Sequence, residues 1–418
     1  MDRDGGLSVL QLRVAWTGLL AGCYLSHAPP ADVAVTDGIV DGSADSPICD
    51  PSSEAAPPPF GRRRLLWRSS LGEYGPTTAQ VVFDPAGNRI ALTAGPAGDR
   101  LVVFEDECPL GTPARGSALP VWSSDGRTLL VLARVSSIRT LLAYTVGAGL
   151  AASYSFVVPR DPPSILPLPL AVDANGSTIL TYGFDALSTV RSYDAVGREL
   201  HRWTEGPSDG SWDYFSAIPG GGRVAIGMPS DFPRTDGYLS RIELLDRLDD
   251  GSFRLGTVIG ENELGGGMRI GVTPSWTPDG RTLAFLGTAR PPAAPSAELF
   301  VFSFDDDLRW TVARSGPVLS PYHNSDWEPV DLRADGRQVL VNTCTTDRIE
   351  DCALHLFEVR GDAIEEIWTE RPTLDGVLLC PTAADIAPDG RIAVLAPTGC
   401  SDRTPGSSPA TYLFVYEP

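Results

Sequence analysis

Carboxylates are the side chains of this chain that come closest to a pattern with chemical meaning. Asp331 and Asp385 each stand directly before an apolar residue of a repeated motif, in two consecutive copies of that motif. Two acids at equivalent positions of a repeat would face the same central channel and could hold a cation there. A calcium ion takes about six to eight oxygen ligands, so these two acids are only weak metal candidates, and we predict neither a metal nor another cofactor.

Patterns typical of hydrolytic enzymes are weak in this sequence. Gly206-Pro-Ser-Asp-Gly210 matches Gly-x-Ser-x-Gly, but a nucleophile elbow needs a strand before the serine and a helix after it. Pro207 precedes the serine and no helical pattern follows, so we interpret this stretch as a loop. No two of the four histidines are spaced as metal ligands, and the absence of lysine excludes Schiff-base chemistry within this chain. These observations lean away from an enzyme.

Two segments combine aromatic and charged residues as recognition surfaces do. The competing interpretation is that the aromatic rings cap the core beneath long loops, because they bury a large apolar area. The predicted binding face consists of Trp212, Asp213, Tyr214, Tyr322, His323, Asp326, Trp327 and Glu328.

Composition limits the classes of partner and of fold. The formal charge is −20, from 53 acidic residues and 33 basic residues that are all arginine. Nucleic-acid binding requires clustered positive charge, so we predict no nucleic-acid partner. The 43 glycines and 37 prolines in 418 residues indicate many turns and few long helices, which favours an all-β chain.

An internal repeat determines the predicted fold. Each copy has an apolar residue, two variable residues, a turn residue and a glycine, followed by an apolar strand. Proline presets φ, aspartate bonds its own backbone and glycine supplies a positive φ, so each copy should join two antiparallel strands. The seven copies are Phe83–Gly87, Trp122–Gly126, Val172–Gly176, Ile218–Gly222, Trp276–Gly280, Leu332–Gly336 and Ile386–Gly390.

The last repeat lacks a fourth strand, and a candidate for it stands at the other end of the chain. Unit seven ends after Thr411 to Tyr416, whereas Arg64 to Ser69 resembles the fourth strands of other units. Closure by this strand would leave no open edge. We therefore predict a seven-bladed β-propeller over residues 62–418, closed by an N-terminal strand. The short first interval between repeats leaves eight blades as an alternative.

The Pro-Asp-Gly copies, such as Trp276-Thr-Pro-Asp-Gly280, resemble the repeats of the TolB-like propellers of Gram-negative bacteria. The resemblance covers about residues 65–418 and implies the propeller fold. The chain has no counterpart of the α/β N-terminal domain of TolB, so the resemblance gives no reason to expect TolB's partners. A repeat of this kind specifies a fold much better than a function.

The N-terminal segment resembles a bacterial lipoprotein signal. A short apolar stretch from Val14 ends in Leu20-Ala-Gly-Cys23 and is shorter than the roughly 20 residues that span a bilayer. We expect a signal peptide over residues 1–22, a lipid on Cys23 as the only membrane attachment, and a disordered Pro/Ala/Ser-rich tether over residues 23–61. Tyr24 in place of aspartate favours, by the same resemblance, the outer membrane, with the protein facing the periplasm or the cell surface.

Six cysteines remain after Cys23, and an even count in an exported chain favours disulfides. Their positions allow Cys344 to pair with Cys352 across one loop, and Cys380 to pair with Cys400 between two loops of unit seven. Cys49 and Cys108 would then pin the tether to unit one. Sequence alone does not fix these pairings.

The repeat also separates the two ends of the predicted propeller. All Asp-Gly turns should lie at one end, and the long loops at the other, where binding residues commonly sit on a rigid scaffold. We predict a non-catalytic, lipid-anchored envelope protein that binds a protein or an envelope polymer through this loop-rich face. The alternative is a propeller enzyme of lyase, lactonase or glycosidase type at the channel mouth, and a purely structural envelope component is a third possibility.

Overall fold

Every regular element of the described residues is a β-strand, as the glycine and proline content predicted. Among these residues no helix has the length and apolarity to cross a membrane. The described residues belong to the unit formed by residues 44–418. The computed structural model describes residues 46–47, 53–56, 58–69, 80–94, 100–105, 108–111, 117–135, 138–158, 167–173, 176–184, 187–204, 214–228, 241–260, 263, 268–270, 274–289, 297–307, 309–319, 330–343, 353–398 and 410–418.

The strands form antiparallel groups of four that follow one another along the chain. Four groups are separate sheets: β4 (Gln80–Phe83), β5 (Arg89–Ala94), β6 (Arg100–Glu105) and β7 (Cys108–Gly111); β8 (Ser117–Trp122), β9 (Thr128–Val135), β10 (Ile138–Val146) and β11 (Leu150–Val157); β12 (Pro167–Val172), β13 (Thr178–Phe184), β14 (Leu187–Tyr193) and β15 (Glu199–Thr204); β16 (Tyr214–Ala217), β17 (Arg223–Met228), β18 (Arg241–Arg247) and β19 (Phe253–Gly260).

Two further groups join into a larger sheet through one parallel pair of residues, Arg314 and Ala363. The first contains β20 (Met268–Ile270), β21 (Ser275–Trp276), β22 (Thr282–Ala289), β23 (Ala297–Phe304) and β24 (Trp310–Leu319), and the second contains β25 (Val330–Leu332), β26 (Gln338–Asn342), β27 (Leu354–Arg360) and β28 (Ala363–Glu370). The last sheet contains β31 (Ala383–Ile386), β32 (Ile392–Pro397), β33 (Thr411–Glu417), β3 (Arg62–Ser69), β1 (Ser46–Pro47) and β2 (Ser53–Ala55), and a separate hairpin contains β29 (Thr373–Leu374) and β30 (Val377–Leu378).

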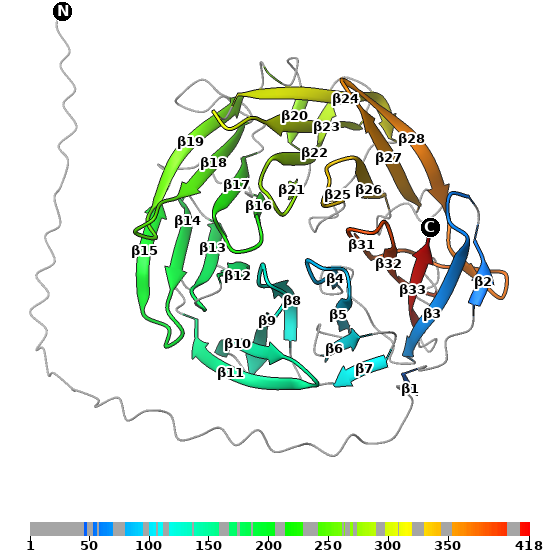
Figure 1. The fold of residues 1–418 in the computed structure, drawn as a ribbon, viewed down its shortest axis with the longest axis horizontal. Coiled ribbons are helices and arrows are strands. Elements are labelled where there is room, and N and C mark those ends of the chain that lie inside the picture. The colour runs from blue at the N-terminus through cyan, green and yellow to red at the C-terminus, as the bar shows by residue number, and fades with distance from the viewer. Residues whose placement is uncertain are drawn as a thin grey trace, which may run out of the picture. The chain divides into compact units, whose positions relative to one another are not determined.

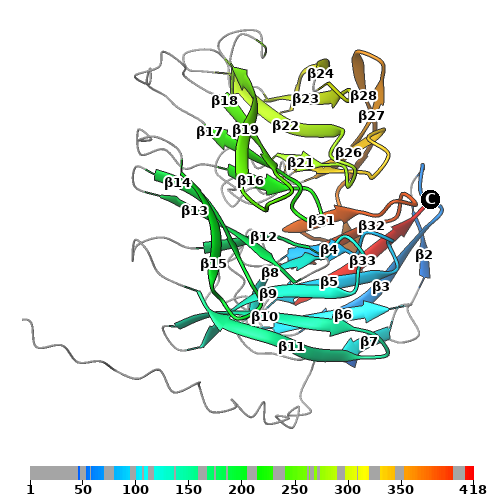
Figure 2. The same cartoon turned by 60° about the vertical axis from the view of Figure 1, so that its left-hand side comes forward.

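The groups stand around a central axis as the blades of a β-propeller, which confirms that part of the predicted fold class (Figure 1). One short strand of each group is innermost, and these inner strands contact one another in a closed cycle in the order β4, β8, β12, β16, β21, β25, β31 and back to β4. Figure 2 shows β4, β5, β6 and β7 in order from the centre outwards. The apolar core lies between neighbouring sheets, where side chains of one sheet pack on the next, as Ile242 and Leu244 of β18 do on Phe285 of β22.

The repeated turns have the chemistry that the sequence predicted. In each copy a glycine with φ between 67° and 91° closes the turn, a region of φ that favours glycine. In the turn after β8, the Gly126 amide donates to the carbonyl oxygen of Ser123 at 2.9 Å. The Asp125 carboxylate accepts from the Ser123 hydroxyl at 2.6 Å and from the Arg127 amide at 3.0 Å. These local bonds explain the Asp-Gly-Arg spacing of the repeat.

The predicted register of the fourth repeat is wrong by one residue. The amide of Gly221, with φ of 68°, donates to the carbonyl oxygen of Ile218 at 2.8 Å, as Gly280 does to Thr277. The apolar anchor of this copy is therefore Ala217 and its turn glycine is Gly221. Three consecutive glycines hid this register from the sequence. A Cβ at position 221 would lie 2.2 Å from Cδ1 of Ile179 in the neighbouring sheet, so packing makes glycine necessary here.

The predicted pairing of the N-terminal strand with the last strand is confirmed. β3 runs antiparallel to β33, with Arg63 opposite Tyr416 and Trp67 opposite Leu413, and the two strands lie side by side at the two ends of the colour scale (Figure 1). The Trp67 side chain is buried in the core between this sheet and the β4 sheet. The first and last strands of the propeller thus share one sheet.

The prediction that the segment up to residue 61 cannot pack against a core is wrong for its last part. β2 pairs with β3, and the Phe60 side chain is only 4% exposed. The Phe60 ring lies 4.9 Å from the ring of Trp368 and 5.8 Å from that of Tyr416, centre to centre. One aromatic anchor at the end of a Pro/Ala-rich stretch was enough to attach it, because a buried ring contributes a large apolar area. The predicted signal peptide and the first part of the tether lie outside the described residues.

Candidate functional site

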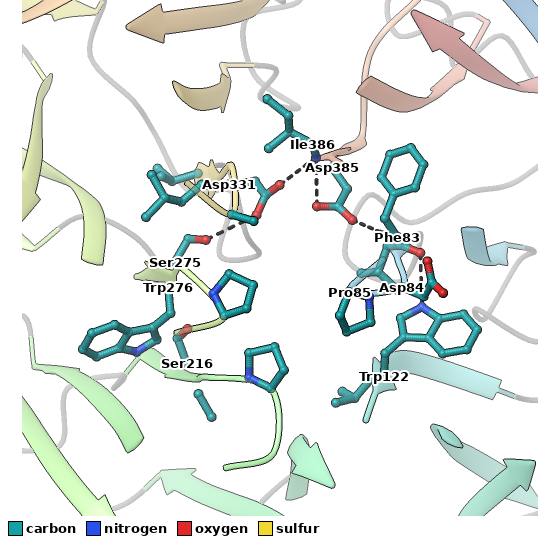
Figure 3. Close-up of a pocket in the computed structure, with 18 of the residues that line it drawn as sticks. Phe83, Asp84, Pro85, Trp122, Ser216, Ser275, Trp276, Asp331, Asp385 and Ile386 are labelled. Atoms are coloured by element: carbon teal, nitrogen blue, oxygen red, sulfur yellow. Dashed lines mark hydrogen bonds between the residues drawn. The ribbon is translucent and has the colours of Figure 1, made fainter. Parts of the chain in front are cut away.

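A cavity of about 260 Å³ lies where the inner strands meet. Its walls come from β4, β8, β16, β21, β25 and β31 and from the turns that follow these strands. Figure 3 shows the side chains that face it. The volume is slightly below the roughly 300–1,000 Å³ of pockets for drug-sized ligands, so the cavity suits a small molecule.

The inner strands around the cavity differ in polarity at one equivalent position of the repeat. This position is the residue directly before the apolar anchor. Four consecutive inner strands place polar residues there, and we call this set the polar arc: Ser216, Ser275, Asp331 and Asp385. The other three inner strands place apolar residues there, which we call the apolar arc: Val82, Val121 and Ala171. The corrected register of the fourth repeat brings Ser216, in place of Ala217, into the polar arc.

Asp331 and Asp385 come together on one side of the cavity, as their equivalent positions predicted (Figure 3). The amide of Ile386 donates to Asp331 at 2.7 Å and to Asp385 at 2.9 Å. The second oxygen of Asp385 accepts from the amide of Phe83 on β4. The Ser275 hydroxyl donates to Asp331 at 3.3 Å. Each carboxyl group therefore accepts an N–H from the next inner strand, and together they connect β25 to β31 and β31 to β4.

Burial raises the pKa of Asp385 well above its ordinary value. The neighbouring Asp331 raises this pKa further, through its charge and its hydrogen bond, while the amides of Phe83 and Ile386 lower it without cancelling the shift. Two carboxyl groups that share a site resist a second negative charge in this way. The pair therefore retains a proton at pH values at which an ordinary aspartate has lost it.

The described residues do not assemble a metal centre around this pair. Within them, no three His, Cys, Asp or Glu side chains come together in a way that could hold a metal ion. Asp331 and Asp385 supply four oxygens, three of which already accept backbone N–H groups. Their chemistry is that of a proton-sharing connection between strands.

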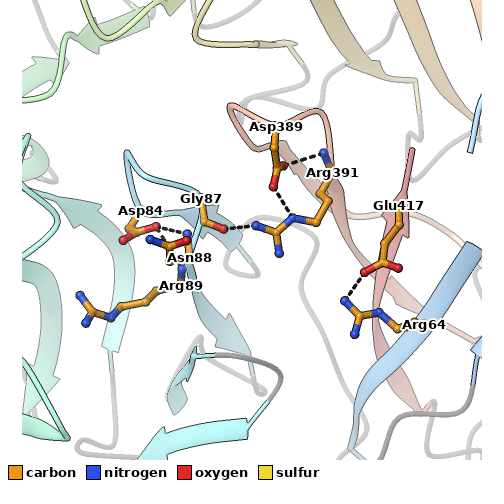
Figure 4. A network of polar contacts seen from close by, with 8 residues as sticks. All are labelled: Arg64, Asp84, Gly87, Asn88, Arg89, Asp389, Arg391 and Glu417. Atoms are coloured by element: carbon orange, nitrogen blue, oxygen red, sulfur yellow. Dashed lines mark hydrogen bonds and ion pairs between the residues drawn. The ribbon is translucent and has the colours of Figure 1, made fainter.

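A second polar network ties neighbouring repeat turns together, at the end of the inner strands where these turns lie (Figure 4). Arg391 donates to the carbonyl oxygen of Gly87 at 2.5 Å, and Arg89 donates to that of Gly126 at 3.3 Å. Arg223 donates to the carbonyl oxygen of Gly280 at 3.0 Å in the same way. Arg89 and Arg223 begin β5 and β17, Arg391 directly precedes β32, and each of the three reaches the turn of the next repeat. Among them only Arg391 directly follows its turn glycine, so the Gly-Arg pattern of the repeat marked this network only in part.

Most residues of the predicted binding face lie outside the described residues. These are Trp212, Asp213, Tyr322, His323, Asp326, Trp327 and Glu328. Tyr214 is the first residue of β16.

The same limit applies to most of the predicted lipidation and disulfide residues, namely Cys23, Cys49, Cys344, Cys352 and Cys400. Cys108 begins β7, and Cys380 is buried at 3% exposure. The predicted cysteine pairs therefore stay predictions.

The sequence interpretation missed a hydrogen-bonded chain that joins β27 and β28 to the residue after β26. His355 lies 2.9 Å from Glu366 through Nδ1 and 3.2 Å from Thr343 through Nε2. Burial raises the pKa of Glu366, but hydrogen bonds from Thr369 and His355 outweigh it and leave the pKa below its ordinary value. This order of groups resembles a hydrolytic triad, yet the Thr343 hydroxyl also donates to the carbonyl oxygen of Ala353 at 3.1 Å. No local sequence pattern marked these residues, because they come together only through the pairing of neighbouring strands.

Comparisons with known proteins give the fold and no family. No family model and no curated protein matches the chain. An oligogalacturonate lyase in complex with manganese has a TM-score of 0.53 at 14% identity, over 90% of this chain and 97% of that one. An oligogalacturonate lyase from Vibrio parahaemolyticus has a TM-score of 0.52 at 13% identity, over 87% and 96%. The β-propeller domain of the Trilobed protease from Pyrococcus furiosus reaches 0.46 at 12% identity, over 81% and 93%.

The fold is a β-propeller. At this level of identity the likeness concerns the fold alone, so the propeller scaffold does not by itself select a function.

Proposed function

We propose that this chain is a non-catalytic binding propeller of the envelope of a Gram-negative bacterium. In this proposal it has seven blades, is anchored by a lipid on Cys23 to the outer membrane, and binds a protein or an envelope polymer through its loop-rich face. The resemblance of its Pro-Asp-Gly repeats to those of TolB-like propellers and the Leu20-Ala-Gly-Cys23 sequence support these assignments.

The non-catalytic part of this proposal is carried by one observation, the hydrogen bonds of the two channel acids to neighbouring inner strands. Asp331 and Asp385 each accept an amide N–H of the following inner strand. The amide that binds Asp385 is that of Phe83 on β4, the first inner strand of the ring. A carboxyl group held in this way serves the closure of the scaffold. Arginines at the turns also bind neighbouring repeats. The repeats are therefore connected both at the inner strands and at the turns.

The rigid strands present the intervening segments at the end opposite the glycine turns. β17 and β18 are antiparallel, as are β22 and β23 and also β32 and β33, so the ends that bracket residues 229–240, 290–296 and 399–409 lie on that side. Recognition residues commonly occupy such positions on a rigid framework.

Cross-linking in the native cell envelope tests this proposal. The lipidated protein is purified after gentle cross-linking, and co-purified material is compared between wild type and Trp212→Ala/Trp327→Ala. A matched control is Leu200→Ala/Leu255→Ala, which changes side chains that are 41% and 44% exposed on the outer strands β15 and β19. The proposal predicts a partner that is lost in the tryptophan variant and kept in the control. A partner lost equally in both variants, or no partner, contradicts it.

One observation favours the second candidate, a propeller enzyme acting at the channel mouth. The pKa of Asp385 is raised by burial and by Asp331 beside a cavity, and a raised carboxyl pKa suits a general acid. Oligogalacturonates are the first substrates to assay, because two of the similar structures are named as lyases of that class. Lactones and glycosides follow. Turnover that Asp385→Asn abolishes while the protein stays folded would support this candidate over the binding propeller.

A further inference from the structure

The cavity between the inner strands carries an inference that is separate from the loop-rich face. The acids that line it are Asp84, Asp331 and Asp385, and its described lining contains no arginine or histidine. The Asp84 carboxylate is engaged in its own turn, where it accepts from the amides of Asn88 at 2.7 Å and Arg89 at 3.0 Å. The negative charge that faces the cavity without a basic partner in its lining therefore belongs to Asp331 and Asp385.

The polar arc offers acceptors in an arrangement that suits an ammonium group. The Ser275 hydroxyl donates to Asp331 at 3.3 Å and keeps its lone pairs for a further donor. Ser216 adds a second hydroxyl on the next inner strand. An ammonium group has up to three N–H donors and one positive charge, which match the hydroxyl and carboxylate acceptors of this arc. A divalent metal ion needs more oxygen ligands than this arc provides.

The opposite wall suits an apolar chain. Val82 and Val121 line the cavity on β4 and β8, which lie across the ring of inner strands from Ser275 on β21, and the ring of Trp122 lines the cavity beside Val121. Apolar contact with such a wall stabilises a short hydrocarbon group, because burial removes its surface from water. The cavity of about 260 Å³ limits the ligand to a small molecule.

We propose that the central cavity binds a small organic monocation, a primary ammonium compound with a short hydrocarbon chain. The ammonium group lies against Ser216, Ser275 and Asp331, and the hydrocarbon chain lies against Val82 and Val121. The chain's formal charge of −20 also favours the approach of a cation. This site is distinct from the loop-rich face, which binds its partner at the outer end of the strands.

Calorimetric titration of the full-length protein with butylammonium tests the site. The neutral isostere 1-butanol and the anion butyrate are titrated under the same conditions of pH and ionic strength. We expect saturable binding of butylammonium, with affinity at least tenfold above that of either comparison compound. Asp331→Asn should weaken butylammonium binding about tenfold or more, and Ser216→Ala about threefold to tenfold.

Two control variants separate this site from general electrostatics and from the loop-rich face. Asp306→Asn removes one charge at a side chain that is 87% exposed and far from the cavity lining, and it should leave the affinity unchanged. Trp212→Ala/Trp327→Ala should also leave it unchanged, so that failure of the proposed function is distinguishable from failure of this site.

Three outcomes would overturn the proposal: no saturable binding, equal binding of 1-butanol, or equal loss in Asp331→Asn and Asp306→Asn. If Asp331→Asn does not give the β-sheet circular dichroism of wild type, Ser216→Ala decides, because it removes one hydroxyl from the cavity wall. Wild-type affinity in Ser216→Ala then counts against the site.

Discussion

The polar and apolar arcs of the channel occupy the same backbone position in successive repeats and differ only in side chain. On the polar arc, Asp331 and Asp385 hold the next inner strand through its amide. On the apolar arc, Val121 packs within the core cluster of its own sheet and its neighbour. The repeat therefore fixes a position in space, and each copy can use it either for hydrogen bonding or for packing. The inner strands β25 and β31 use it for hydrogen bonding, and β31 belongs to the sheet that the N-terminal strand β3 completes.

The largest expected effect comes from truncating each arc in turn. Asp331→Ala/Asp385→Ala leaves the amides of Phe83 and Ile386 without their side-chain acceptors, and each unsatisfied group costs about 1–3 kcal/mol. We expect a loss of about 2–5 kcal/mol in the free energy of unfolding. Val82→Ala/Val121→Ala removes only part-buried methyl groups and should cost about 1–2 kcal/mol. Urea denaturation measures both, and equal losses would show that the two arcs do not differ in function.

Of the two arcs, only the polar arc should make the free energy of unfolding depend on pH. The pKa of Asp385 is raised by burial and by Asp331, so the folded protein keeps a proton that the unfolded chain loses above about pH 4. The free energy of unfolding therefore falls as the pH rises from there to the raised pKa, by up to about 1.4 kcal/mol per pH unit. Asp385→Asn cannot ionise and should flatten this slope in urea denaturation between about pH 4 and pH 9.

The control for this pH series is Asp306→Asn, at an exposed position paired with Arg281. It should retain the wild-type slope. A wild-type slope in Asp385→Asn would assign the pH dependence to other groups.

Arginine substitutions at the repeat turns should lower stability by the same amount beside either arc. Arg89 reaches the Gly126 carbonyl beside the apolar arc, and Arg223 reaches the Gly280 carbonyl beside the polar arc, at 3.3 and 3.0 Å. Since both are charge-assisted bonds to a backbone acceptor, Arg89→Ala and Arg223→Ala should each cost about 1–2 kcal/mol. Thermal denaturation of the two variants should give melting temperatures that agree closely. A much larger loss on one side would extend the difference between the arcs to this end.

The smallest effect is expected at the two tryptophan anchors. The indole N–H of Trp122 donates to the Val82 carbonyl at 3.4 Å, whereas that of Trp276 is buried without a hydrogen-bond partner among the described residues. Trp122→Phe should therefore cost about 0.5–1 kcal/mol more than Trp276→Phe. Chemical denaturation of both variants measures this difference, and the opposite order would contradict the assigned bonding.

Several features of the fold could be predicted from the sequence because local chemistry encodes them. The Asp-Gly turns have short side-chain-to-backbone bonds, such as that of Asp125 to the Arg127 amide, and these depend on neighbours in the chain. The apolar stretch after each turn predicted a strand, and the missing last strand directed attention to residues 64–69, which do pair with β33. The register at Gly220 to Gly222 failed, because local sequence offers three equal choices and only contact with Ile179 selects one.

The candidate site could be predicted from the sequence only in part. The sequence alone determined that Asp331 and Asp385 occupy equivalent positions and would face one channel, because a repeat copies backbone geometry. It did not determine that Asp385 accepts from Phe83, 302 positions earlier in the chain, or that His355 meets Thr343 and Glu366. Only the tertiary structure decided the proton sharing, the two arcs and the cavity, because burial and charge proximity arise from strands that meet when the ring closes.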